Sequence, residues 1–272
     1  PRVKVYSAPL PTNALLQDTF EIINHVMEPE MLGFGLAGLH HFYPKYRAFR
    51  DAHRGQQLYF CSIDIRHCYD NIPQDQLMEK LNDMLKGVQD FILQKYVILY
   101  EQSDCVRRVV RRDVHTLDNV QGFEDVVQNV LAHKYYDSVF VDGVQQVAVQ
   151  REQLLRTLEE HLQNHMVVSQ GRFGKSYLRQ SRGIPQGSIL SSILCNFHYG
   201  NVEKELLGGS TWSNLLLARM IDDFLLVTTD ADEVEKFLTI MHKGNDKLGV
   251  EINPEKTKAS IAVRTLLSND NR

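Results

Sequence analysis

The sequence contains no long hydrophobic run and no closely paired cysteines. No stretch approaches the roughly eighteen uninterrupted apolar residues of a membrane-spanning helix, so we expect no membrane association. Residues 1–10 lack the basic, apolar and small-residue pattern of a secretory signal peptide. Without a CxxC pair, the cysteines suit a reducing compartment rather than a disulfide framework. The four cysteines are Cys61, Cys68, Cys105 and Cys195.

Excess positive charge is also missing, since 30 basic residues face 34 acidic ones and the net charge is −4. This balance counts against nucleic-acid binding, which requires Lys and Arg to neutralise phosphates. The basic residues are nevertheless clustered, although a solvated surface explains each cluster when it is taken alone. The clusters are Arg107, Arg108, Arg111 and Arg112, and Arg172, Lys175, Arg179 and Arg182.

The apolar pattern predicts an α+β chain with helices on one side of a small sheet. Residues 58–65 (LYFCSIDI) are rich in β-branched and aromatic side chains and predict a buried strand. Residues 215–229 predict a strand, a turn and a second strand, and Asp230 can cap the helix that follows. Further predicted elements are helices within 13–54 and at 73–85, 150–166, 189–207 and 232–248, a strand pair at 138–149 with its turn at 142–143, and a final strand at 250–253.

Three acidic residues stand out because their sequence neighbours are apolar. Asp64 lies in a predicted buried strand, where a carboxylate is costly unless something compensates its charge. Asp222 and Asp223 lie at the bend between the apolar runs MI and FLLV. A turn commonly accommodates one Asp. It does not account for two adjacent acids and a third in another strand.

Divalent metal ions would remove the cost of these carboxylates. Oxygen ligands at strand ends can hold two Mg²⁺ ions about 4 Å apart, as in phosphoryl-transfer enzymes. Such ions activate an attacking 3′-hydroxyl and stabilise the leaving pyrophosphate. We expect Asp64 and Asp222 to be the main ligands, Asp223 a weaker one, and the backbone carbonyl of Ile65 a further one.

The segment after Asp64 resembles the first palm motif of reverse transcriptases, in which a strand Asp is followed by four residues and an aromatic. Here the string is DIRHCYD, and the aromatic is Tyr69. The resemblance implies that the Tyr69 ring lies beneath the sugar and clashes with a 2′-hydroxyl, which selects deoxynucleotides. An ordinary core tyrosine is the alternative interpretation.

Two further motifs extend this resemblance. The loop RGIPQGS at 182–188 has two glycines that allow close backbone approach and a proline that stiffens the turn. It resembles the template–nucleotide motif of the family. In INPEKT at 252–257, Lys256 matches the position of a general acid for the leaving pyrophosphate, although a surface lysine is the alternative. The loop implies nucleotide contacts from Gln186 and Gly187, and nucleic-acid contacts from Arg182 and Gly183.

Longer strings narrow the resemblance to telomerase reverse transcriptase of the animal type. They are IDIRHCYDNIPQDQL, CVRRVVRRDVHTL, GKSYLRQSRGIPQGSILSSILCNFHYGNVE and RMIDDFLLVTT. The resemblance implies a helical fingers–palm connection at 1–57, the first palm motif at 58–83, a largely helical fingers insertion at 84–170 and the remaining palm at 171–272. Lys175, Arg107 and Arg108 would lie near nucleic acid.

The family resemblance also implies an activity and partners. The implied activity is that of an RNA-directed DNA polymerase that adds telomeric repeats to chromosome 3′ ends in the nucleus. Implied partners are a telomerase RNA template, a single-stranded telomeric DNA primer, dNTPs and other holoenzyme proteins. The chain would be a fragment without thumb or RNA-binding domain, and poorly active alone. The alternatives are a mobile-element reverse transcriptase, which the flanking strings and long middle segment disfavour, and a truncated, non-catalytic nucleic-acid-binding piece.

Overall fold

The computed structural model divides the chain into two compact units. The three-stranded unit comprises residues 1–26 and 78–164, and the four-stranded unit comprises residues 27–77 and 165–272. The structure describes residues 10–36, 38–88, 90–102, 105–117, 122–131, 138–171, 174–210 and 212–261.

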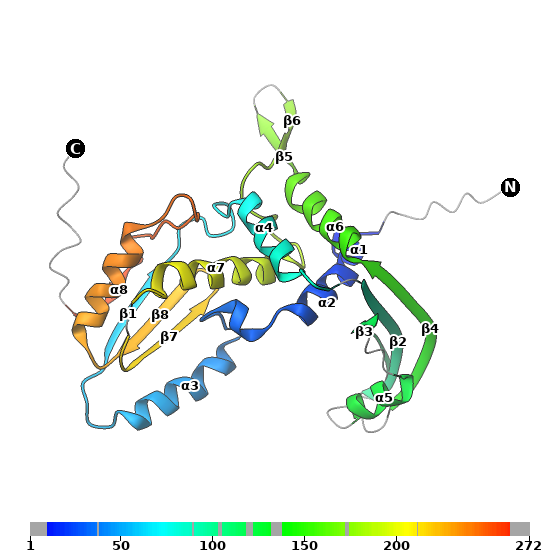
Figure 1. The fold of residues 1–272 in the computed structure, drawn as a ribbon, viewed down its shortest axis with the longest axis horizontal. Coiled ribbons are helices and arrows are strands. Elements are labelled where there is room, and N and C mark those ends of the chain that lie inside the picture. Colours follow the sequence, from blue (N-terminus) through cyan, green and yellow to red (C-terminus); the bar gives the residue numbers. More distant parts are fainter. Residues whose placement is uncertain are drawn as a thin grey trace. The chain divides into compact units, whose positions relative to one another are not determined.

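An antiparallel sheet with strand order β7-β8-β1-β9 forms the centre of the four-stranded unit (Figure 1). The inner strand β1 buries Cys61 and Ile63, as its apolar sequence predicts. It pairs with β8 along its whole length, so the last residue of β1 lies opposite the first residue of β8. The strands are β1 (Tyr59–Asp64), β7 (Leu215–Met220), β8 (Asp223–Thr228) and β9 (Lys258–Ala259).

Helix α8 packs against β1 and β8 through one apolar face. The side chain of Asp230 caps it by accepting from the N–H of Asp232 at 2.9 Å, as predicted. The helix ends at Lys243, earlier than the predicted 248, because Gly244 adopts a positive φ of 62°. This unit also contains η1 (Pro29–Leu32), α3 (Leu39–Ala52), α7 (Ser191–Leu207), α8 (Ala231–Lys243) and the exposed hairpin of β5 (Met166–Gly171) and β6 (Gly174–Arg179); the boundary between the units falls within α4 (Gln74–Met84).

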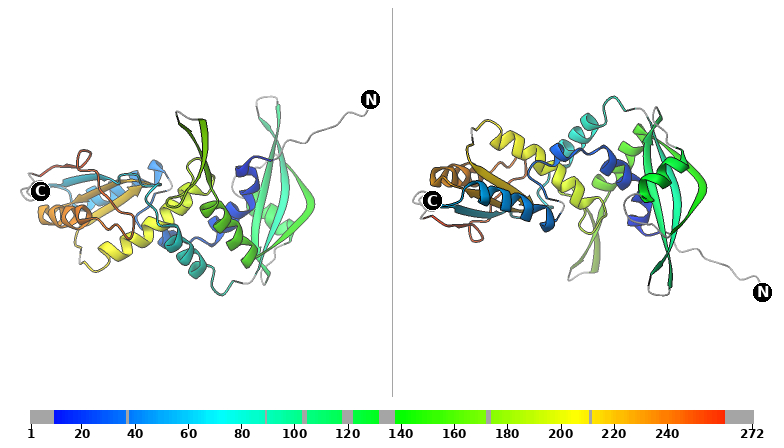
Figure 2. Two further views of the ribbon diagram at one scale, coloured as in Figure 1. Left: turned by 90° about the horizontal axis from the view of Figure 1, so that it is seen from above. Right: turned by 90° about the horizontal axis from the view of Figure 1, so that it is seen from below.

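A second antiparallel sheet, with order β3-β2-β4, forms the three-stranded unit. Figure 2 shows its strands as long, twisted ribbons in green. Tyr96 and Ile98 of β2 are buried in a cluster with Phe123 and Phe140. Helix α2 contacts β3, and α6 contacts β4. The elements are α1 (Thr12–Leu15), α2 (Gln17–Val26), β2 (Asp90–Gln102), β3 (Cys105–Thr116), α5 (Phe123–Leu131), β4 (Ser138–Gln150) and α6 (Arg151–Gln163).

The α+β class is confirmed, but three local predictions were wrong. Segment 84–170 is not largely helical, because β2, β3 and β4 occupy much of it. The strand pair at 138–149 is one strand, whose pairing with β2 shifts register at Lys95/Tyr96 and so accommodates Gly143 without a turn. At 250–253 only isolated bridges form. No described helix has both the length and the apolar character needed to cross a membrane.

Candidate active site

An open cleft at the end of β1 brings together residues that are far apart in the sequence. Its lining includes six of the predicted site residues, namely Asp64, Ile65, Tyr69, Gln186, Asp222 and Lys256, and also Asp70 and Asn253.

Strand register sets the positions of the three carboxylates. Asp64, the last residue of β1, is the Cα partner of Asp223, the first residue of β8. Side chains directly opposite each other in an antiparallel pair lie on the same face and close together. Asp222 occupies the β7–β8 turn, and its carbonyl accepts from the N–H of Ile65 at 3.0 Å. The end of β1 is thereby bound to the Asp-Asp turn.

One ammonium group partly balances these acids. Lys256 Nζ donates to Asp64 Oδ2 at 2.9 Å, and the Asp64 side chain is only 8% exposed. This bond raises the pKa of Lys256. Burial raises the pKa of Asp223, and the carboxylates of Asp222 and Asp64 raise it further, against the opposing effect of Lys256. The cleft therefore favours an additional positive charge.

The carboxylates suit a hard divalent cation in donor type, since such ions prefer oxygen ligands. Among the described residues, however, no group of three His, Cys, Asp or Glu side chains is arranged as a ready ligand set. Lys256 already bonds one Asp64 oxygen that a cation would use. The residues fit a divalent ion by chemistry and register, while the ligand arrangement itself is not formed.

Residues 69–72 and the loop at 182–188 are hydrogen-bonded to each other beside the cleft. Gly183 has a φ of 83°, and a Cβ there would lie 2.6 Å from the carbonyl oxygen of Tyr69, so only glycine fits. Its N–H donates to Ile72 at 2.8 Å, and the N–H of Ile184 donates to Tyr69 at 2.8 Å. The structure thus gives Gly183 a packing role, in addition to any predicted contact with nucleic acid.

Tyr69 and Gln186 each have an identified partner. The half-buried Tyr69 side chain is hydrogen-bonded to Ser192, and burial raises the pKa of its phenol. Gln186 Nε2 donates to Asp70 Oδ1 at 3.1 Å. These bonds fix the ring and the amide at the rim of the cleft.

The other predicted residues lie outside the cleft lining. Arg182 donates to the carbonyls of Asn71 and Asp246, and it lines a neighbouring groove together with Gln186. Lys175 is exposed on β6, and Gly187 is exposed with a φ of 82°. Arg107 and Arg108 are exposed on β3 of the three-stranded unit, and Arg172 lies outside the described residues.

Sequence reasoning missed four polar residues that line the cleft, namely Arg66, His67, Asp70 and Asn253. Asp70 holds Gln186, and its position next to Tyr69 was the available indication. The N–H of Asn253 donates to the Asp64 carbonyl at 2.9 Å, and its side chain accepts from the N–H of Glu255 at 3.1 Å. The Asn-Pro dipeptide indicates such a turn. This turn carries Lys256 to Asp64.

Comparisons with known proteins agree with this geometry. The family model "Reverse transcriptase (RNA-dependent DNA polymerase)" matches residues 133–266, which include the loop at 182–188, the Asp-Asp turn and Lys256. Telomerase reverse transcriptase from Canis lupus familiaris is 30% identical over 261 residues, covering 91% of this chain and 22% of that protein. The Mus musculus protein is also 30% identical, with 91% and 23% covered.

Solved structures give the same fold. Telomerase from Candida albicans, in complex with a TWJ fragment of telomeric RNA, superposes with a TM-score of 0.63 at 18% identity, covering 93% of this chain and 35% of that one. Apo telomerase from Candida tropicalis gives a TM-score of 0.61 at 17% identity, with 90% and 36% covered. The chain thus spans about a fifth of the length of its curated relatives. Residues 133–266 match the reverse transcriptase family, and over most of its length the chain is homologous to telomerase reverse transcriptase.

Proposed function

We propose that the cleft is the nucleotidyl-transfer site of an RNA-templated DNA polymerase of the telomerase type, which adds telomeric repeats to chromosome 3′ ends. The observation that carries this proposal is Asp64 opposite Asp223 with Asp222 beside them, served by a single ammonium. The strong matches to telomerase relatives favour this reading over a mobile-element enzyme. The three intact acids argue against a non-catalytic fragment.

Divalent metal is the cofactor that reverse transcriptases generally use, and we propose two Mg²⁺ ions for this site. Asp64 and Asp222 would hold them, with Asp223 and the Ile65 carbonyl as further ligands. When bound, the ions activate the primer 3′-hydroxyl and stabilise the leaving pyrophosphate. The proximity of the three carboxylates supports this assignment: burial raises the pKa of Asp223 most, and the charges of Asp222 and Asp64 raise it further.

Lys256 is proposed as the proton donor to the leaving pyrophosphate. A lysine is protonated at neutral pH, and the bond to Asp64 raises the pKa of Lys256 further. It sits on a turn, and its side chain is 63% exposed, which leaves it able to move from Asp64 towards a product. A positioned acid of this kind contributes about 10²–10⁴-fold to the rate of a reaction.

The rim residues would select and orient the nucleotide. The Tyr69 ring would lie beneath the sugar and exclude a 2′-hydroxyl, while Gln186 and Gly187 contact the incoming dNTP. Ser192 and Asp70 hold Tyr69 and Gln186 in place. The required selectivity is steric, so it depends on the bulk of the Tyr69 ring rather than on its hydroxyl group.

The nucleic-acid partners follow from the same proposal. They are a telomerase RNA template and a single-stranded telomeric primer, with other holoenzyme proteins, in the nucleus at telomeres. Arg182 lies in the groove beside the cleft, which supports a contact with nucleic acid. Gly183, Lys175, Arg107 and Arg108 remain proposed contacts. Residues 78–164 fall in one compact unit together with residues 1–26, which supports the proposed insertion at 84–170.

The carboxylates provide the decisive test of this function. In the complete protein with its RNA, Asp64→Ala, Asp222→Ala and Asp223→Ala should each lower primer extension by more than about 100-fold, since even residues behind metal ligands cost 10–100-fold. Circular dichroism should show unchanged folding. Glu235→Ala, an exposed acid on α8, is the matched control and should extend primers normally. Full activity in any of the three variants would rule out the metal assignment.

The sugar filter has its own test. Tyr69→Ala should raise the ratio of ribonucleotide to deoxynucleotide incorporation by about tenfold or more, in the range of other steric selections. Tyr69→Phe keeps the ring and removes only the bond to Ser192, so its ratio should stay near that of the wild type. Single-nucleotide extension with matched rNTP and dNTP measures both, and an unchanged ratio in Tyr69→Ala would refute the filter.

A further inference from the structure

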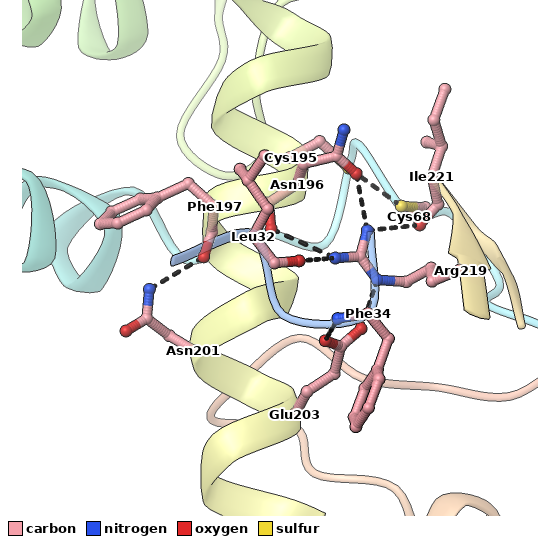
Figure 3. A network of polar contacts seen from close by, with 10 residues as sticks. All are labelled: Leu32, Phe34, Cys68, Cys195, Asn196, Phe197, Asn201, Glu203, Arg219 and Ile221. Atoms are coloured by element: carbon pink, nitrogen blue, oxygen red, sulfur yellow. Dashed lines mark hydrogen bonds and ion pairs between the residues drawn. The ribbon is translucent and has the colours of Figure 1, made fainter. Parts of the chain in front are cut away.

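A fully buried arginine lies in the strand that leads into the Asp-Asp turn. Arg219, near the end of β7, has a side-chain exposure of 0%, and its partner Glu203 on α7 has 2% (Figure 3). Burying a charge is costly unless it is paired and fully hydrogen-bonded. Such a residue in the four-stranded unit therefore calls for a reason beyond simple packing.

Every N–H of the Arg219 guanidinium has an acceptor. Nε donates to Glu203 Oε1 at 2.5 Å. Nη1 donates to Asn196 Oδ1 at 2.7 Å and to the carbonyl of Ile221 at 3.2 Å. Nη2 donates to the carbonyls of Leu32 at 3.1 Å and Asn196 at 3.2 Å. The group thus joins α7, the end of η1 and the turn after β7, as Figure 3 shows.

The loop after η1 closes around this arginine on its other side. The N–H of Phe34 donates to Glu203 Oε2 at 2.7 Å, and the N–H of Arg219 donates to the Phe34 carbonyl at 2.8 Å. A Cβ on Gly200 would lie 2.2 Å from the carbonyl oxygen of Met31, so α7 and this loop are in close backbone contact. The residues that bind Arg219 from α7 and from the loop after η1 therefore belong to one tightly packed frame.

The frame contacts the β7–β8 turn at a residue with an unfavourable backbone conformation. Ile221 is β-branched and has a φ of 60°, a left-handed conformation that such residues rarely adopt. Arg219 holds the Ile221 carbonyl, and the N–H of Ile65 holds the Asp222 carbonyl at 3.0 Å. Two consecutive peptide groups of the turn are thus fixed from different elements, one on each side of Asp222.

We propose that Arg219, held by Glu203 and Asn196, is a positioning residue that fixes the Asp222 and Asp223 carboxylates for metal binding. This inference rests on the proposed function of the cleft. Arg219 itself does not line the cleft, so its effect is transmitted through the Ile221 carbonyl. The fully bonded guanidinium makes the turn rigid in the one conformation that puts both acids beside Asp64.

The test uses the complete protein with its RNA and Mn²⁺ as the probe. Arg219→Lys keeps the charge but cannot satisfy Glu203, Asn196 and Ile221 together, because an ammonium lacks the guanidinium fork. We expect about tenfold or greater weakening of Mn²⁺ binding, measured by electron paramagnetic resonance, with a similar fall in kcat. The Kd for primer should not change. Glu203→Gln should also weaken Mn²⁺ binding, and it replaces Arg219→Lys in the test if Arg219→Lys fails to fold.

Glu233→Gln is the matched control, since Glu233 is a buried acid on α8 that contacts the β7–β8 hairpin at the end opposite the Asp-Asp turn. It accepts from Thr228 Oγ1 at 2.6 Å and from Ser213, away from the turn. It should lower thermal stability without altering Mn²⁺ binding.

The outcomes separate the two levels of proposal. If folded Arg219→Lys binds Mn²⁺ like the wild type while Asp222→Ala is inactive, only the role of Arg219 is refuted. If Glu233→Gln loses Mn²⁺ binding as strongly as Arg219→Lys, the effect is general destabilisation and the positioning role also fails. Primer extension by Asp222→Ala would instead refute the proposed function of the cleft.

Discussion

The two units of the chain balance acidic side chains in opposite ways. In the three-stranded unit, one carboxylate meets two cations, since Asp18 of α2 accepts from Lys95 at 2.7 Å and from Arg112 at 2.8 Å. At the end of β1 in the four-stranded unit, the three acids Asp64, Asp222 and Asp223 share one ion-pair partner. The ion pairs found among the described residues bring only Lys256 to this group, and it bonds Asp64.

This difference separates a structural charge cluster from a functional one. A carboxylate surrounded by cations needs nothing further, and its bonds tie α2 to β2 and β3. Carboxylates that repel one another store an unfavourable energy, which a fold retains only where a ligand repays it. Asp223 is in this situation, because burial raises its pKa and the carboxylates of Asp222 and Asp64 raise it further.

Removing the Lys256 ammonium should have the largest effect on this contrast. In the complete protein, Lys256→Ala should lower kcat for primer extension by about 100-fold or more, since it removes the proposed proton donor. Lys256→Arg should restore little, because arginine does not release its proton. Lys258→Ala, an exposed lysine two residues further on, is the control and should be unaffected. A wild-type kcat in Lys256→Ala would remove the general-acid role.

The sequence predicted the four-stranded unit better than the three-stranded one for a physical reason. In β1 and β8, apolar residues dominate strands that are buried in the sheet, and the carboxylates at their ends are conspicuous by contrast. In β3, the string CVRRVVRRDVHT alternates in doublets, so neither a two-residue nor a 3.6-residue period is visible. A strand with such a pattern is recognised only through its partner β2.

The candidate site was also predicted only in part. Asp64, Tyr69, Asp222 and Lys256 were identified from local strings, and the structure brings them to one cleft. Arg219 could not be identified, because its burial depends on the carbonyl of Leu32, 187 residues earlier in the chain. Local patterns thus predict the residues at a site, whereas the residues behind them follow from packing between distant segments.

Breaking the balanced cluster should have a moderate effect confined to stability. Asp18→Asn removes both ion pairs and should lower the free energy of unfolding of the three-stranded unit by about 1 kcal/mol, the upper range for partly exposed pairs. Native-state hydrogen exchange of β2 and β3 measures this. Asp83→Asn, which breaks the exposed pair with Lys86, is the control and should change little. A greatly altered metal dependence in Asp18→Asn would contradict the division between the two clusters.

Relieving the repulsion in the cleft should have the smallest effect and the opposite sign. Because the folded-state pKa of Asp223 is raised, its charged form destabilises the fold, and this penalty is present above the folded pKa and disappears as the pH falls through it. At neutral pH without divalent ions, Asp223→Asn should therefore unfold at a slightly higher Tm than the wild type. The gain should be about 0.5 kcal/mol after solvent screening.

The wild type and Asp223→Asn also test whether the repulsion between the carboxylates serves metal binding. Adding Mg²⁺ should raise the Tm of the wild type more than that of Asp223→Asn, because the ion stabilises only the state that binds it. The two Tm values should therefore converge, or their order should reverse. If Asp223→Asn were less stable in EDTA and Mg²⁺ shifted both proteins equally, the acids would be ordinary turn residues. The contrast with Asp18 would then be one of exposure rather than of function.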